Sequence, residues 1–310
     1  MSGLPSFSLD DVRDVEERRD GWAVPRSGGG GDMGARRSRL RRVRWLPHQR
    51  IAVLKEVDLC AEDFVTEGVH VVAERLSRVR ADASRDGRAQ YLAEYVALHV
   101  DSPRHYQWLL SSYGPSLRDV LLTPSLAPFT EERCKGVLRR VLLALDQLHR
   151  VNMYVHADVS LSNVLTSTSS YDDVVLGDLE SMSPIGTVPN RCLGSYLFMA
   201  PERLVDGALP FGHHDDVWAF GIVCYNLLAW DVAHPWCALK TETDHSENYW
   251  AFLGLMSKAK DVPLSQLLLQ TPLSRCSKEA LAFIEVCLSW EATRRPSAAE
   301  LLQHSWLLSR

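Results

Sequence analysis

The spacing of apolar residues changes from strand-like to helix-like along this 310-residue chain, and this change narrows the folds that the sequence allows. The first part of the chain holds short apolar runs of strand length, at 50–59, 92–100 and 105–113. The later part is mainly helical in pattern. Strands gathered before helices are typical of α+β proteins, so we expect two lobes that divide near residues 112–117.

The clearest single element is an amphipathic helix over residues 130–150. Its apolar residues at 137, 141, 142, 145 and 148 follow the 3.6-residue period of a helix, and Thr130 is a suitable first residue. We also expect short strands at 162–167 and 173–179, and helices over 9–19, over 61–80 and from 213 almost to the C-terminus.

Composition excludes several classes of protein. The seven cysteines are scattered without a Cys-x-x-Cys pair, which argues against a disulfide framework or a zinc site and favours a reducing, intracellular compartment. The first twenty residues lack the apolar core of a signal peptide, and the longest apolar stretch, 218–230, is too short to cross a bilayer. From the short apolar stretch we expect no membrane partner. Because the formal net charge is −5, we expect no binding to nucleic acid by the protein as a whole.

Two aspartates and an asparagine carry the strongest chemical signal. Asp158 lies in YVHADVSLSNVL, with Asn163 five residues later, and Asp178 ends the apolar run VVLGD. Carboxylate and amide oxygens at strand ends are suitable ligands for hard cations such as Mg²⁺. A lone aspartate more often caps a turn, but the order and spacing of these three residues favour a shared site.

This order of residues resembles the protein kinase domain. His156-Ala157-Asp158 followed by Asn163 matches the catalytic loop H-R-D-L-x-x-x-N, and Asp178-Leu179-Glu180 stands where the family has D-F-G. Four further motifs follow the order of the family, namely Ala52-Val53-Leu54-Lys55, Met199-Ala200-Pro201-Glu202, Asp216-Val217-Trp218-Ala219-Phe220-Gly221 and Arg294-Arg295-Pro296. The resemblance covers roughly residues 25–308.

The resemblance implies an α+β, bilobal fold. A small β-rich N-lobe would span residues 25–112 and a larger helical C-lobe residues 113–310, after an N-terminal extension over 1–24. It also implies transfer of the γ-phosphate of ATP to a protein substrate, with Mg²⁺ as cofactor. Ser195, within GSYLFMAPE, stands where Ser/Thr-directed kinases carry a hydroxyl residue, which favours serine or threonine as the acceptor.

The resemblance assigns roles to individual residues. Asp158 would accept or orient the substrate hydroxyl, Lys55 would pair with the α- and β-phosphates, and Asn163 and Asp178 would hold Mg²⁺. Lys55 lies in a buried run where an unpaired lysine is costly, which favours this role over a side chain that extends to solvent. The implied nucleotide contacts are Gly29, Gly31, Gly34, Val53, Lys55, Glu74, Ser112, Tyr113 and Leu165.

Two of these assignments leave alternatives open. Glu74 lies 19 residues after Lys55 and Glu67 only 12, and the longer spacing better suits a strand, a turn and two helical turns before the glutamate that holds Lys55. A solvated helix face is the alternative for Glu74. Gly29 to Gly34 match G-x-G-x-x-G, but such a match is weak within a run of four glycines, so a flexible linker is the alternative there.

Three departures from the family pattern bear on activity. Ala157 replaces the arginine before the catalytic aspartate, which argues against control by activation-loop phosphorylation. Ser160 and Ser162 stand where the family has a lysine or arginine that stabilises the transferred phosphoryl group. Glu180 replaces the flexible glycine of D-F-G and adds negative charge.

These departures keep three functions open. The first is an active, divergent Ser/Thr protein kinase. The second is a pseudokinase that acts as a binding scaffold with little or no phosphotransfer. The third is a kinase-like enzyme that acts on a small molecule, which the A-P-E segment and the complete helical lobe disfavour because they shape a peptide site.

The arginine run Arg36–Arg44 holds six arginines and has two interpretations. It is either a basic patch for an acidic partner or a nuclear signal, or one face of a solvated strand with Val43 and Trp45 pointing inward. We favour the strand.

The run His213-His214-Asp215-Asp216 has the residue types of a metal site. Consecutive side chains at the start of a helix diverge, so they rarely share one ion. The resemblance implies instead a structural role, which we favour, in which Asp216 anchors the backbone of the catalytic loop. The same resemblance predicts a buried ion pair between Glu202 and Arg295, which would be costly to break from one side.

Overall fold

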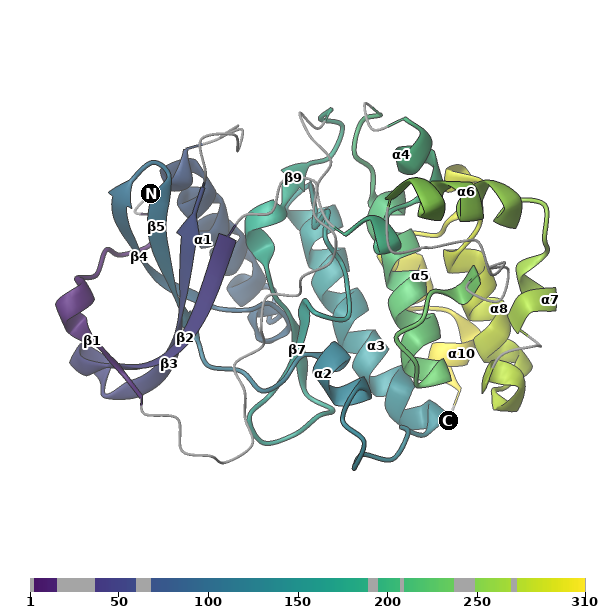
Figure 1. Ribbon diagram of the computed structural model, residues 1–310, viewed down its shortest axis with the longest axis horizontal. Coiled ribbons are helices and arrows are strands. Elements are labelled where there is room, and N and C mark those ends of the chain that lie inside the picture. Colours follow the sequence, from purple (N-terminus) through teal and green to yellow (C-terminus); the bar gives the residue numbers. More distant parts are fainter. Residues whose placement is uncertain are drawn as a thin grey trace.

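The computed structural model describes residues 3–15, 37–59, 68–188, 195–206, 209–236, 249–268 and 272–309. A β-sheet with one long helix forms one end of the molecule, and a helical part forms the other (Figure 1). The expected α+β fold with two lobes is therefore confirmed.

A five-stranded antiparallel sheet forms the smaller lobe, in the order β1-β2-β3-β5-β4. Its strands are β1 (Val12–Asp14), β2 (Arg37–Trp45), β3 (Arg50–Asp58), β4 (Tyr95–Ser102) and β5 (His105–Ser111). The strands predicted at 50–59, 92–100 and 105–113 are confirmed. Lys55 lies opposite Leu40 of β2 and Trp108 of β5, so these three side chains share one face of the sheet.

The two faces of this sheet pack against different partners, because alternate residues of a strand point to opposite sides. One face carries an outer cluster of Phe7, Val43, Trp45, Ala52, Leu54, Ala97 and Leu109. The other face, which includes Val57 and Trp108, packs against α1 (Val69–Arg85). The helix predicted over 61–80 is confirmed from residue 69, and residues 60–67 lie outside the described part. Lys55 points to the α1 side of the sheet.

Residues 3–15 belong to this lobe. The N–H of Leu98 donates to the carbonyl of Pro5 at 2.9 Å, Phe7 is buried in the outer cluster, and β1 extends the sheet beyond β2. The helix predicted over 9–19 is wrong at Val12–Asp14, because the open edge of β2 pairs with an extended chain there. The expected boundary between an extension at 1–24 and the N-lobe stays a prediction, since residues 16–36 lie outside the described part.

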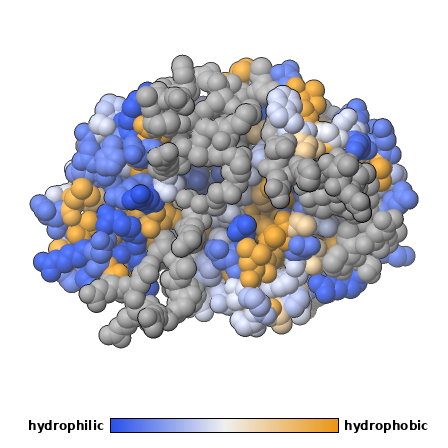
Figure 2. Space-filling view, viewed as in Figure 1, coloured by the Kyte–Doolittle hydropathy of each residue, from blue (hydrophilic) through white to orange (hydrophobic). Residues whose placement is uncertain are grey.

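The strand interpretation of the arginine run agrees with the structure. Residues 37–45 form β2, where Val43 and Trp45 are buried while Arg42 and Arg44 are exposed. Arg41 pairs with Asp14 at 2.7 Å and with Glu56 at 3.0 Å. Hydrophilic side chains gather over the end of the molecule that carries the sheet, on the left in Figure 2.

The larger lobe is built on two helices. In α3 (Glu131–Asp146), the predicted amphipathic helix, the Thr130 hydroxyl accepts a hydrogen bond from the N–H of Arg133 at 3.3 Å and so caps the helix start. The helix α5 (His213–Ala229) is buried along nearly its whole length and contacts α3 and α8 (Lys278–Cys287). A π-helical turn, Gln147–Val151, follows α3.

Short elements complete this lobe. The predicted strands at 162–167 and 173–179 are confirmed as an antiparallel pair, β7 and β8. The bounds of the remaining elements are α2 (Leu117–Leu121), β6 (Tyr154–Val155), β7 (Val164–Thr166), β8 (Val174–Leu176), β9 (Ser183–Pro184), α4 (Pro201–Val205), α6 (Tyr249–Ala259), α7 (Leu264–Leu268), α9 (Ala298–Leu301) and α10 (Ser305–Leu308).

One buried apolar cluster runs from the α1 side of the sheet through α3 to α5 and α8, so the two lobes share a core. The chain passes between them at Gly114, whose N–H donates to the carbonyl of Thr166 at 2.7 Å. A Cβ at Gly114 would lie 2.4 Å from the carbonyl oxygen of Ser167, so this close approach requires glycine. Among the described residues, no helix combines the length and the apolar character needed to span a membrane.

Candidate active site

The loop that carries Asp158 is held by a buried carboxylate from α5. Asp216 accepts hydrogen bonds from the N–H groups of His156 (2.7 Å) and Ala157 (2.9 Å), and it also bonds the Nε2 atom of His149 at 2.8 Å. Ala157 has a φ of +65°, a left-handed conformation that a non-glycine residue adopts at a cost unless its surroundings fix it. The predicted role of Asp216 as a backbone anchor is therefore confirmed.

The Asp158 carboxylate is held at both oxygens. Its Oδ1 atom accepts from the N–H of Ser195 at 3.1 Å, and its Oδ2 atom accepts from the Nδ2 atom of Asn163 at 2.9 Å. Burial, together with repulsion from Asp178, raises the pKa of Asp158 to about 6. A carboxylate with such a pKa is suited to accept a proton near neutral pH.

Asp178 leaves the end of β8 next to this loop. Its backbone is left-handed, with a φ of +54°, and its Oδ1 atom lies 2.7 Å from the Nζ atom of Lys55. The N–H of Gly177 donates to the carbonyl of Asn163 at 2.7 Å, which joins the two segments. The fold thus brings together Lys55 of β3, Asp158 and Asn163 of one loop, and Asp178 at the end of β8.

A second carboxylate also contacts Lys55, and sequence reasoning did not identify it as a partner. The Oε1 atom of Glu180 lies 3.0 Å from the Nζ atom of Lys55, and the Tyr95 hydroxyl donates to the same oxygen at 3.0 Å. Burial by itself would lower the pKa of Lys55, but attraction to Asp178 and Glu180 outweighs burial and raises it. Lys55 is therefore a firmly protonated ammonium group.

The predicted pair of Lys55 with Glu74 is not the pair that the structure forms. Glu74 lies on α1 but is exposed, because its neighbours Ala73 and Arg75 occupy the buried side of the helix. Arg75 donates to the carbonyl of Met182 at 2.6 Å, just beyond Glu180. Glu67, the alternative helix glutamate, lies outside the described residues.

The structure describes four of the other predicted nucleotide contacts, namely Val53, Ser112, Tyr113 and Leu165. Val53 is partly buried on β3, on the face that carries Lys55, and Leu165 is partly buried on β7. Ser112 and Tyr113 lie in the segment between the lobes, where the Tyr113 hydroxyl accepts from the N–H of Glu94 at 2.9 Å. Gly29, Gly31 and Gly34 lie outside the described residues, in the connection between β1 and β2.

Comparison with known proteins identifies the family. The model of the protein kinase domain matches residues 96–307, more than half of the chain. This chain belongs to the protein kinase domain family. The resemblance that the motifs indicate is thereby confirmed, and the family is one of ATP-binding transferases.

Similar proteins include several kinases. Mitogen-activated protein kinase kinase 2 of Arabidopsis thaliana is 27% identical over 195 residues, which is 63% of this chain and 50% of that protein. Serine/threonine-protein kinase Nek3 of Oryza sativa subsp. japonica is 27% identical over 270 residues, 86% of this chain and 41% of that protein. This chain thus spans half or less of the length of these two relatives.

A solved structure shows the same fold. The twitchin kinase region from C. elegans superposes with a TM-score of 0.66 at 19% sequence identity, covering 86% of this chain and 43% of that chain. This likeness supports the bilobal kinase fold, and at this identity it carries no information on substrate.

Two departures from the kinase pattern have clear structural settings. Ser160, where the family has a cation, is a buried residue of the catalytic loop. Ala157, where the family has arginine, presents no charge toward the segment that includes Ser195. The described part of the loop from Asp158 to Asn163 therefore carries no lysine or arginine.

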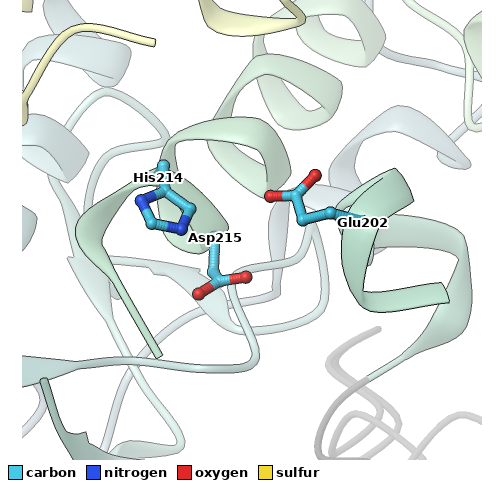
Figure 3. A group of neighbouring side chains, drawn as sticks. All are labelled: Glu202, His214 and Asp215. Atoms are coloured by element: carbon cyan, nitrogen blue, oxygen red, sulfur yellow. The ribbon is translucent and has the colours of Figure 1, made fainter. Parts of the chain in front are cut away.

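A group of potential metal ligands lies close to this site, on α4 and at the start of α5. Glu202, His214 and Asp215 place one ligand atom each within 4.8 Å of one another (Figure 3). Both carboxylates are already neutralised by arginines: Arg295 donates to both oxygens of Glu202 at 2.7 and 2.8 Å, and Arg203 donates to both oxygens of Asp215 at 2.9 and 3.0 Å. Two bidentate ion pairs disfavour a cation here, and the predicted Glu202–Arg295 pair is confirmed.

Proposed function

We propose that this kinase domain transfers the γ-phosphate of ATP to the hydroxyl of a serine or threonine in a protein substrate. The observation that carries the proposal is the convergence of Asp158, Asn163, Asp178 and Lys55 at one site, with Asp158 hydrogen-bonded to Asn163 and Lys55 paired with Asp178. The names of relatives such as the serine/threonine-protein kinase Nek3 support the choice of acceptor.

The residues fit a magnesium ion by their donor atoms. Asn163 directs its amide nitrogen to Asp158, which leaves its amide oxygen as a ligand, and the side chain of Asp178 is 36% exposed. Oxygen donors of this kind are what Mg²⁺ prefers, and when bound it would offset the charge of the phosphates.

Asp158 would act as the base. It accepts the proton of the substrate hydroxyl while that oxygen forms a bond to the γ-phosphorus, and the bond from phosphorus to the bridging oxygen of ADP breaks. The N–H of Ser195 and the amide of Asn163 hold the carboxylate in place for this step. Lys55, firmly protonated, would bind the α- and β-phosphates and so fix the leaving group.

A pseudokinase is the second candidate, and one observation favours it. Ser160 is buried and the loop from Asp158 to Asn163 supplies no cation, so charge on the transferred group is less well offset than in the family pattern. In that case the site would bind nucleotide and a partner protein but transfer little phosphate.

The test is transfer of the γ-phosphate from Mg·ATP to a generic basic protein substrate. Asp158→Asn should lower the rate by a factor of about 10²–10⁴, the usual contribution of a positioned base. The exposed Asp261→Asn serves as the matched control and should leave the rate unchanged. Nucleotide binding without transfer in the wild type would instead support the pseudokinase, and the absence of both would contradict the two candidates.

A further inference from the structure

The ammonium group of Lys55 contacts two carboxylates that differ in their surroundings. Its Nζ atom lies 2.7 Å from Asp178 and 3.0 Å from Glu180. The side chain of Asp178 is 36% exposed, whereas that of Glu180 is only 3% exposed. The outer carboxylate is open to a ligand from solvent, and the inner one is enclosed by protein.

Contacts on several sides fix the position of Glu180. The Tyr95 hydroxyl donates to its Oε1 atom, and the ring of Tyr95 packs edge-on against Trp108 with ring centres 5.6 Å apart. Glu180 stands in a short 3₁₀ turn, Leu179–Ser181, whose Ser181 hydroxyl donates to the carbonyl of His156 at 2.9 Å. The carboxylate thus has little freedom to leave Lys55.

The helix α1 supplies a cation, not a carboxylate, to the neighbourhood of Glu180. It presents Arg75 to the segment that follows Glu180, with a hydrogen bond to the Met182 carbonyl and the guanidinium over the ring of Tyr154, 5.3 Å from its centre. Glu74 on the same helix is exposed. Within the described part of α1, a cation faces the site and the carboxylate for Lys55 comes from the loop after β8.

We propose that Glu180 is the positioning residue for Lys55, and that it keeps the ammonium group in place when Asp178 is engaged by a metal ion. This inference rests on the proposed function. An ammonium group has three N–H donors. One reaches Glu180, one reaches Asp178, and the third is available for phosphate.

The Lys55–Glu180 ion pair joins elements of both lobes at the candidate active site. The Lys55–Glu180 pair lies between β3 and a loop of the larger lobe, so it links the two lobes without using a carboxylate from α1. The glutamate that replaces the flexible glycine of the family pattern therefore has a positive role, because its charge is neutralised by the same lysine that it positions.

Two measurements on the full chain test this inference. The first is the rate at which an amine-reactive acylating reagent modifies Lys55 in the absence of nucleotide, followed by peptide mass spectrometry. The second is the affinity for Mg·ADP by calorimetry. Glu180→Gln keeps the shape of the side chain and removes its charge, Glu180→Asp keeps the charge on a shorter stem, and Glu74→Gln is the matched control.

We expect Glu180→Gln to raise the acylation rate of Lys55 several-fold and to weaken Mg·ADP binding by about 10–100-fold, the value of one charge-assisted hydrogen bond. Glu180→Asp should fall between Glu180→Gln and the wild type, and Glu74→Gln should match the wild type in both measurements. Equal acylation rates in Glu180→Gln and wild type would overturn the inference.

The outcome also separates this inference from the proposed function. If the wild type binds Mg·ADP and Glu180→Gln binds it equally well, the role of Glu180 is refuted while the proposed function stands. If the wild type does not bind Mg·ADP at all, the proposed function fails, and the positioning role falls with it even where acylation responds to the substitution.

Discussion

At the scale of single residues, the pKa of Asp158 gives a pH-dependent prediction. Its pKa in the folded protein is about 6, above the ordinary value of 3.8, so the folded state holds this proton more tightly than the unfolded state. The contribution of this group to stability is therefore lost as the pH rises from about 4 to about 6. Above that range the folded protein contains a buried carboxylate that is costly to ionise.

We therefore expect Asp158→Asn to stabilise the protein at pH 7.5 by about 1–2 kcal/mol, less than the full pKa shift implies because the amide accepts fewer hydrogen bonds. The measurement is urea unfolding of both proteins in EDTA at pH 7.5 and pH 5. The difference in the free energy of unfolding between Asp158→Asn and the wild type should shrink at pH 5, where Asp158 in the wild type is largely protonated. A difference that is the same at both pH values would show that the effect is not electrostatic.

What the sequence predicts at this scale depends on distance along the chain. Asp158 and Asn163 lie five residues apart in one loop, so their spacing alone indicates that they share a site, and their side chains are hydrogen-bonded. The partner of Lys55 was mispredicted, because the choice between Glu74 and Glu180 depends on how α1 and the loop after β8 lie relative to β3. That arrangement is set by tertiary packing, which the spacing of residues along the chain does not predict.

At the scale of elements, two helical glycines are expected to respond oppositely to the same substitution. A Cβ at Gly221 of α5 would lie 2.7 Å from Leu288 and 2.9 Å from Cys287, at the contact with α8. A Cβ at Gly136 of α3 would meet nothing within 4 Å. The first glycine permits close helix packing, and the second only lowers helix propensity.

Gly221→Ala should destabilise the protein by about 1–3 kcal/mol through overpacking, whereas Gly136→Ala should stabilise it by about 0.5–1 kcal/mol. Thermal unfolding of the two variants beside the wild type measures both. Equal shifts in the same direction would mean that α5 and α8 separate without cost, contrary to the buried contact described above.

Element prediction succeeded where the signal is local. The helix over 130–150 and the strands at 50–59, 92–100 and 105–113 carry their own periodicity, and all of them form. The polar segment at 9–19 has no such pattern, and Val12–Asp14 becomes a strand only because the edge of β2, some thirty residues later, is open to pair with it. Edge pairing of this kind is decided by the partner strand.

At the scale of the whole molecule, the chain has a core shared by both lobes and a smaller outer cluster formed within the smaller lobe alone. The shared core joins both lobes through α3 and α5. The outer cluster lies on the side of the sheet away from α1 and is completed by Phe7, from the segment that precedes β1. The N-terminal residues therefore close the smaller lobe, although their composition is polar.

The burial of Phe7 in the outer cluster predicts that this residue stabilises the smaller lobe. Phe7 is 7% exposed and Leu9, two residues later, is 41% exposed, so the pair tests burial within one short segment. Phe7→Ala should lower the free energy of unfolding by about 2–4 kcal/mol, since it removes an aromatic ring from a packed cluster, while Leu9→Ala should change it by less than about 0.5 kcal/mol. Urea unfolding of the full chain measures both values. If Phe7→Ala costs no more than Leu9→Ala, the segment lies on the sheet without stabilising it, and the smaller lobe must be held by the shared core alone. A large cost for Phe7→Ala alone makes residues 3–15 an integral part of the kinase domain.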